Sequence, residues 1–153
     1  MSYPRDLLDA AIELYRVDPQ TQATLRRSVS TAYYALFHLI IETACANWPP
    51  SQRIRVARQF EHKRMKEVSA DVVRKGRPPV SAVQTGLIAV TNTFVQLQEN
   101  RHAADYDLGV VLMPDEVALD ILLVEDAFRT WGDIKDDPIV QDYLFSLLFK
   151  DRS

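Results

Sequence analysis

The sequence predicts an all-α fold, an antiparallel bundle of about five helices with a short helix at its C-terminal end. Three observations lead to this prediction. Apolar residues recur at the spacing of about 3.6 that gathers them on one face of a helix. Only four of the 153 residues are glycine, and no run alternates apolar and polar residues between turn signals as the strands of a sheet do. We expect one domain over residues 1–153, with its core in about residues 3–132 and a C-terminal helical extension in residues 133–153.

The first helix is expected over Tyr3–Tyr15, where the apolar residues form one stripe. Asp18 followed by Pro19 then has the pattern of a helix cap with proline at the first helical position. The second helix should run from there to about Asn47, because the sequence Trp48-Pro49-Pro50 cannot continue a helix.

The middle of this second helix, from Val29 to Ile41, is apolar on nearly every side. A helix of this kind lies in the centre of a bundle, so we expect it to be the most buried one. Tyr33, Tyr34 and Phe37 should belong to the core or to a dimer interface rather than to a platform that stacks bases. We expect His38 to be a buried, hydrogen-bonded histidine rather than a catalyst.

A third helix is predicted to begin at Ser51 and to end before the loop at residues 74–79. Its apolar stripe comprises Ile54, Ala57, Phe60, Met65, Val68 and Val72, and its other side holds Arg53, Arg55, His62, Lys63 and Lys66. Residues 51–77 contain nine Lys and Arg against three acids, whereas residues 99–153 contain five against thirteen. This basic segment suits a phosphate-rich partner, and it equally suits pairing with the acidic C-terminal part, within the chain or between subunits.

Ser81 with Gln84 three residues later is a capping-box pattern, and it predicts a fourth helix that ends near Asn100. A polar cluster, Arg101-His102-Ala103-Ala104-Asp105-Tyr106-Asp107, follows this helix. A guanidinium, an imidazole, two carboxylates and a phenol are costly to gather at a helix junction unless they are paired or used. The cluster is therefore the first place to look for a functional site.

The fifth helix is predicted to begin at Pro114 and to run to Trp131, with Gly132 ending it. Asp115 and Glu116 are acids in its first turn, where the helix dipole favours negative charge. The pair Asp137-Pro138 should start a short last helix that ends near Phe149.

A purely structural interpretation of the polar cluster is an ion-pair network. Arg101 and Asp105 are four residues apart, a spacing at which opposite charges support a helix end. The carboxylates could also receive arginines from the second helix and so join two helices. The residues expected in such a binding network are Arg101, Asp105, Asp107, Arg26 and Arg27.

Two segments resemble one known family. Residues 26–38, with the sequence RRSVSTAYYALFH, resemble the second-helix signature of HEPN domains (higher eukaryotes and prokaryotes nucleotide-binding). Residues 101–107, followed by a helix that opens at Pro114, resemble the later motif of that family. The resemblance covers about residues 3–132 and implies an antiparallel helical bundle that usually forms a homodimer. It also implies that active relatives are metal-independent endoribonucleases, often toxins paired with a small nucleotidyltransferase or used in phage defence.

The family's catalytic motif is an arginine followed, after about four to six residues, by a histidine. Arg101 matches the arginine, and His102 occupies the adjacent position, where a polar residue is common. No histidine follows His102, and Tyr106 stands five residues beyond Arg101, near the position of the family's histidine. A neutral phenol is a poor general base near pH 7.

The missing histidine favours a binding or regulatory module of a toxin–antitoxin or defence type, one that holds RNA, a nucleotide or a protein partner without cleaving it. The alternative is a divergent endoribonuclease that uses Arg101 with His102, and Tyr106 as a further candidate, across a dimer cleft. A third possibility is one half of a toxin–antitoxin pair that is inactive without a neighbouring nucleotidyltransferase.

Other chemistry has weaker support in the sequence. Arg55 and His62 also fit the arginine–histidine spacing and would share a helix face. Three scattered histidines and one cysteine have no metal-ligand spacing, so we expect no metal and no cofactor. The longest apolar stretch, Tyr33–Ala46, is too short to span a bilayer, and acids interrupt the N-terminal residues where a leader would be apolar. We therefore expect a cytoplasmic protein without a membrane segment.

Overall fold

The computed structural model describes residues 2–150 and confirms the all-α fold. These residues form seven α-helices and one short 3-10 turn, and no strand occurs among them. The elements are α1 (Tyr3–Arg16), α2 (Gln22–Cys45), the 3-10 turn η1 (Pro50–Gln52), α3 (Arg53–Ala57), α4 (His62–Lys75), α5 (Ala82–Tyr106), α6 (Pro114–Ile134) and α7 (Pro138–Leu148).

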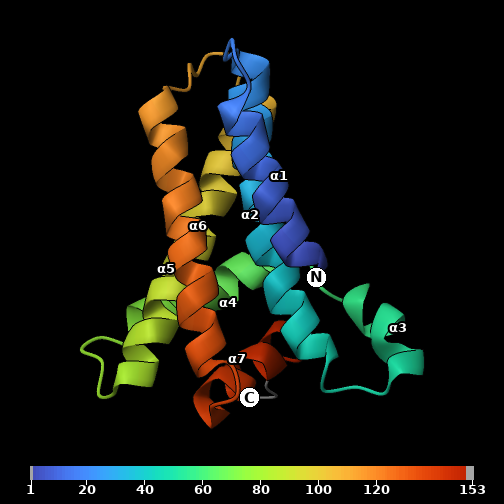
Figure 1. Cartoon of the computed structure of the whole chain (residues 1–153). Helices are drawn as coiled ribbons and strands as arrows, with labels where there is room; N and C mark the ends of the chain where they lie inside the picture. Colours follow the sequence, from blue (N-terminus) through green and yellow to red (C-terminus); the bar gives the residue numbers. More distant parts are fainter. Residues whose placement is uncertain (1, 151–153) are drawn as a thin grey trace.

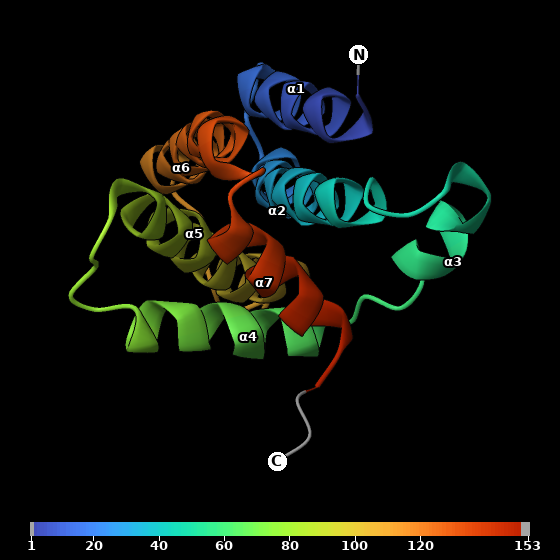
Figure 2. The same ribbon diagram turned by 90° about the horizontal axis from the view of Figure 1, so that it is seen from below.

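Four long helices, α1, α2, α5 and α6, run up and down alternately as an antiparallel bundle (Figure 1). The view from below shows α4 lying across one end of the bundle with α7 beside it, and α3 standing out to the side (Figure 2). Four side chains of α7, Val140, Tyr143, Leu144 and Leu147, belong to the main core. The last helix therefore closes the lower end of the bundle.

The second helix is the central one, as its composition predicts. α2 packs against α1, α5 and α6, and Ala32, Tyr33 and Leu36 on it are fully buried. Tyr33 and Phe37 lie in the main core and Tyr34 packs against it at partial exposure, which confirms that these rings belong to the packed interior of one chain. α2 thus fixes where every other long helix must lie.

The predicted cap at Asp18 is wrong, because α2 begins at Gln22, three residues after the predicted start at Pro19. Thr21 is its cap: the Thr21 hydroxyl accepts from the Thr24 amide at 3.2 Å, and the Thr24 hydroxyl accepts from the Thr21 amide at 3.0 Å. This reciprocal pair satisfies two amides at once, whereas an aspartate cap satisfies one. Residues 17–20 form the connection from α1 instead.

The single third helix of the sequence prediction is also wrong, because the chain breaks between Ala57 and His62 into α3 and α4. Ser51 lies in the 3-10 turn that precedes α3 and caps no helix. Phe60 and Met65 are both buried in the main core. In one continuous helix they would point about 140° apart and could not both face it. The break lets both enter.

α5 continues to Tyr106, so the polar cluster forms its last turns rather than a junction after it. Two alanines, good helix formers, and the Arg101–Asp105 spacing support this extension. Ser81 caps α5 by accepting from the Gln84 amide at 3.1 Å, while the Gln84 side chain accepts from the Val80 amide at 2.8 Å.

α6 passes through Gly132 and ends at Ile134, so the predicted stop at glycine is wrong. Gly132 is exposed, and the continuation places both Trp131 and Ile134 in the core. Their burial outweighs the cost of one glycine in a helix, about 1 kcal/mol. Asp137 caps α7 as predicted, accepting from the Ile139 amide at 3.0 Å.

None of the helices within residues 2–150 combines the length and the apolar character that crossing a membrane requires.

The upper end of the bundle is held by Arg26, which reaches from α2 to the end of α5 and the loop after it. Its guanidinium donates to the carbonyl oxygens of Ala104 at 2.9 Å and Asp107 at 3.0 Å, and also to that of Val110. The expected pairing of Arg26 with the carboxylates of the cluster is therefore corrected: it binds backbone carbonyls. Arg27, its neighbour, is exposed and makes no ion pair among the described residues.

We predict that Arg26→Ala lowers the free energy of unfolding by about 2–3 kcal/mol, because three carbonyls lose a charged donor at once. Urea denaturation followed by circular dichroism measures the loss. Arg27→Ala is the matched control, and its effect should stay within about 0.5 kcal/mol, as is usual for an exposed surface residue. Equal effects of the two substitutions would contradict the assigned role of Arg26.

Candidate functional site

The polar cluster of the sequence is split between two faces of α5. Arg101 and Asp105 face the bundle, whereas His102 and Tyr106 face outward (their ring centroids lie 5.0 Å apart). Successive residues of a helix are about 100° apart, so one continuous helix cannot bring all four together. The structure therefore divides the predicted catalytic set: Arg101 lies within the bundle, and His102 and Tyr106 lie on its surface.

Arg101 is held against α2. Its side chain keeps only 11% of its exposure, and its guanidinium forms an ion pair with Asp105 at 3.5 Å. The guanidinium carbon lies over the ring of Tyr33 at 5.1 Å and near that of Tyr34 at 5.6 Å from the ring centroids. A cation over aromatic faces is stabilised by their π electrons, most strongly where water is excluded. The predicted ion pair with Asp105 is confirmed, and the tyrosines are its additional partners.

Asp105 is shared between two helices. Besides Arg101 it accepts a hydrogen bond from the Ser30 hydroxyl of α2 at 3.3 Å. Asp107 instead accepts from the Gly109 amide at 2.9 Å and shapes the turn after α5. Of the two carboxylates of the cluster, only Asp105 therefore takes part in the contact between α2 and α5.

His62, the first residue of α4, completes the same cluster from a third helix. Its Nδ1 shares a hydrogen bond of 2.6 Å with the hydroxyl of Tyr33, and its ring stacks on Phe37 with centroids 4.4 Å apart. Burial lowers the pKa of His62, and the positive charge of Arg101 and the nearby His38 lower it further. Near neutral pH the imidazole is therefore uncharged. We refer to Arg101, Asp105, Tyr33, Tyr34 and His62 as the Arg101 cluster.

His62 was expected on the side of its helix that holds the basic residues, and this prediction is wrong. His62 precedes Met65 by three residues and Ser69 by seven, both of which are buried. That spacing marks one helix face, so it was the signal that could have assigned His62 to the interior. The break before α4 also puts Arg55 and His62 on different helices, which removes the shared face expected for that pair.

Two buried polar atoms in this region have no hydrogen-bond partner among the described residues: Nε of Arg101 and Oε1 of Gln98. The two residues are three apart on α5, so they lie on one face of it, one turn from each other. Gln98 uses its amide nitrogen to donate to the His62 carbonyl at 3.2 Å. Arg101 therefore keeps one hydrogen-bond donor unused, and Gln98 beside it keeps one acceptor unused.

His38 lies at the edge of the same aromatic group, in partial exposure. Its ring meets Tyr3 edge-on with centroids 5.0 Å apart, and burial lowers its pKa. No hydrogen bond of its imidazole is found within residues 2–150, so the expected hydrogen-bonded histidine is replaced by one that packs against aromatic rings.

A second residue with a shifted pKa, Asp120 of α6, was not predicted from the sequence. It is 6% exposed and lines a cavity of about 260 Å³ between α2, α5 and α6. Burial raises the pKa of its carboxyl to about 6; the Asn100 amide opposes this by donating to it at 3.1 Å, and the charge of Glu116 adds to it. One acid within an apolar helix pattern gives no signal of burial, because acids usually face solvent.

The basic segment is little neutralised by the acidic part of the same chain. One ion pair joins them among the described residues, Lys66 with Glu99 at 3.3 Å. Arg74 and Lys75 pair within their own helix with Asp71. Arg55 and Arg58 are exposed and take part in no ion pair within residues 2–150. Pairing within one chain therefore accounts for a small part of the local positive charge.

We predict that Arg101→Ala lowers the free energy of unfolding by about 1–3 kcal/mol, since it leaves Asp105 without its cation and the two tyrosine rings without cover. His102→Ala, one residue along on the exposed face, should cost about 0.5 kcal/mol or less. Urea denaturation of both variants and the parent protein measures the difference. A larger loss for His102→Ala than for Arg101→Ala would contradict the assignment of the two faces.

The raised pKa of Asp120 makes a prediction about pH. The folded protein holds this proton up to about pH 6 and the unfolded chain only up to the ordinary value of 3.8, so ionisation opposes folding as pH rises between them. Asp120→Asn should therefore stabilise the protein at pH 7.5 by about 1–3 kcal/mol and have little effect near pH 4. Chemical denaturation at the two pH values tests this, with Asp133→Asn as the exposed control on the same helix. An equal effect at both values would contradict it.

The comparisons with protein-family models, with curated proteins and with solved structures find no match for this chain.

Proposed function

We propose that this chain is a HEPN-like helical module that acts by binding: as a homodimer it holds RNA, a nucleotide or a cognate partner, in a toxin–antitoxin or defence type of system, and does not cleave RNA. The resemblance of residues 26–38 and 101–107 to the family supports the first part. The proposal that it does not cleave RNA rests on the position of Arg101, whose guanidinium makes its contacts inside the bundle.

An arginine that stabilises the charge of a reacting phosphate needs free N–H groups facing the substrate. The Arg101 side chain is 11% exposed, pairs with Asp105 and lies over the Tyr33 ring. Turning it outward would break these contacts and leave Asp105 partly buried without its cation. The cost of that movement argues against phosphate stabilisation and for a role in holding α5 against α2.

The homodimer has its own support in the exposed apolar side chains near the upper end of the bundle. These are Leu108, Val111 and Met113 of the loop after α5, and Leu119 and Leu122 of α6, which are between 53% and 91% exposed. Several large apolar side chains exposed within residues 108–122 favour a protein interface there. A small nucleotidyltransferase-type antitoxin is the other candidate for this face. Light scattering should give twice the mass of 17.5 kDa at micromolar concentration, and the single mass would contradict a dimer.

A second candidate is a divergent endoribonuclease, and one observation favours it. His62 is uncharged near neutral pH and contacts the same Tyr33 that lies under Arg101. A neutral imidazole near an arginine is the pair that metal-independent cleavage of RNA needs, one to move a proton and one to stabilise charge. The alternative of a catalytic site across a dimer uses Arg101 with His102 and Tyr106. It requires the outward-facing His102 and Tyr106 of one subunit to reach Arg101 of the other subunit.

The test is incubation of the purified protein with a mixed structured RNA and without added metal, beside Arg101→Ala, His62→Gln and His102→Ala. We expect intact RNA with all four proteins, because Arg101 faces the bundle whereas His102 of the same chain faces outward. Fragments that disappear in Arg101→Ala and His62→Gln would establish the enzyme centred on His62. Loss in Arg101→Ala and His102→Ala would establish the cross-dimer site. Either result would overturn the proposal of a module that does not cleave.

A further inference from the structure

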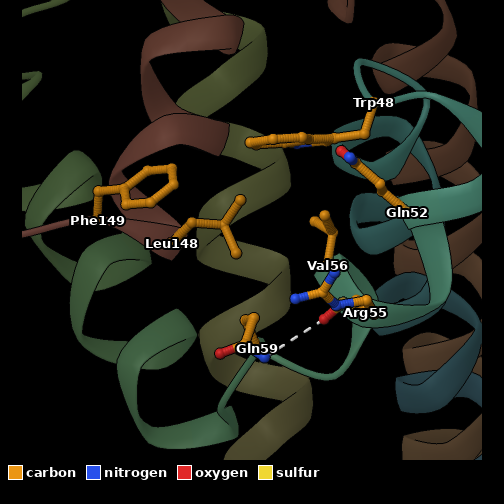
Figure 3. A pocket seen from close by; sticks show the side chains of 7 residues that line it. All are labelled: Trp48, Gln52, Arg55, Val56, Gln59, Leu148 and Phe149. Carbon is orange, nitrogen blue, oxygen red and sulfur yellow. Dashed lines mark hydrogen bonds between the residues drawn. The ribbon is translucent and has the colours of Figure 1, made fainter.

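A hollow away from the Arg101 cluster lies between α3 and the end of α7. It has a volume of about 520 Å³ and opens to solvent. Figure 3 shows the Trp48 indole along one side, Leu148 and Phe149 of the C-terminal segment facing Val56 across the space, and Arg55 with Gln59 at the other end. Hollows of this size with apolar walls and a few polar groups are typical of small-molecule sites.

Arginines hold the main chain that carries both aromatic walls. Arg53 donates from Nε to the Trp48 carbonyl at 2.9 Å, just before the paired prolines. Arg64 of α4 donates to the carbonyls of Ser146 at 2.8 Å and Phe149 at 3.3 Å, which holds the end of α7 in position. The main chain at both walls is therefore already in position, and binding does not have to order it first.

The polar end of the hollow is positive. Arg55 points its guanidinium toward the space and pairs with no acid within residues 2–150. Gln52 and Gln59 add amides at the rim. Among residues 2–150, no acidic side chain lines this hollow. An anion is therefore the group that its polar end would attract, and a planar ring is the shape that its aromatic walls would hold.

A neighbouring hollow of about 410 Å³ shares Trp48, Leu148 and Phe149 with the first and adds Phe145, which is 56% exposed. Aromatic side chains thus border two adjoining spaces. Aromatic side chains that border adjoining spaces can stack with successive bases of a strand. This stacking does not depend on which base is present.

We propose that this hollow binds a nucleoside phosphate, with the base against the Trp48 indole and the phosphate on the Arg55 guanidinium. A free mononucleotide and a nucleotide unit of single-stranded RNA present the same chemistry, and both would fit this description. Only the biological role of this site depends on the proposed binding function. Its walls and charge stand independently of the Arg101 cluster.

Isothermal titration calorimetry with adenosine monophosphate, adenosine, inorganic phosphate and a short single-stranded oligoadenylate tests the site. We expect the monophosphate or the oligonucleotide to bind more tightly than adenosine or phosphate alone, since those lack one of the two recognised groups. Binding of the monophosphate identifies a nucleotide site, and binding of the oligonucleotide alone identifies a strand site. Absence of binding to both would overturn the proposal.

Two substitutions assign the binding to this hollow. Trp48→Ala should weaken it about 5- to 100-fold through lost stacking, and Trp48→Phe should retain most of it. Arg55→Ala should weaken binding about tenfold or more and reduce its salt dependence. Arg77→Ala, in the exposed loop between α4 and α5, removes the same charge elsewhere and should leave binding unchanged.

Circular dichroism and the melting temperature of each variant show whether it is folded before it is titrated. Binding that survives both Trp48→Ala and Arg55→Ala in folded proteins would place the nucleotide elsewhere and overturn the assignment. The result is separable from the cleavage experiment, because a nucleotide can bind here whether or not RNA is cut at the Arg101 cluster.

Discussion

The burial of the middle of α2 on nearly all sides is the constraint from which the rest of the structure follows. A helix that is apolar nearly all round must be covered by other helices, and α1, α5 and α6 provide that cover. The few polar groups that α2 carries inward must then find partners within the protein. Ser28 finds the Ala11 carbonyl at 2.8 Å, and Ser30 finds Asp105. The Arg101 cluster thus follows from the covering of α2 by the other helices.

The parts of the fold that could be read from the sequence are those decided by local patterns. The stripe of α1, the buried middle of α2 and the caps at Ser81 and Asp137 depend on residues within one or two turns, and the structure agrees with them. Two of the errors came where distant contacts decide. The break between α3 and α4 exists because Phe60 and Met65 share one core, and α6 continues past Gly132 because the residues on both sides of the glycine are buried.

The candidate site was foreseen only in part, for the same reason. The Arg101–Asp105 pair is a local spacing and was predicted, whereas the tyrosine rings under Arg101 and the imidazole of His62 come from other helices. A linear motif cannot report a neighbour that a third helix brings in. The pKa of Asp120 was equally hidden, because it depends on desolvation by packed neighbours rather than on the residues beside it in the chain.

The Arg26 contact has a consequence for how this sequence can change over time. All three of its acceptors are main-chain carbonyls, which every amino acid supplies whatever its side chain. This interaction therefore does not constrain the side chains at positions 104–110, which can change as far as their other contacts, such as that of Asp105 with Arg101, allow. The guanidinium has no such freedom, since a lysine offers one ammonium where a flat fork must reach three oxygens. Among related sequences, this geometry would keep an arginine at position 26 while the loop opposite it varies.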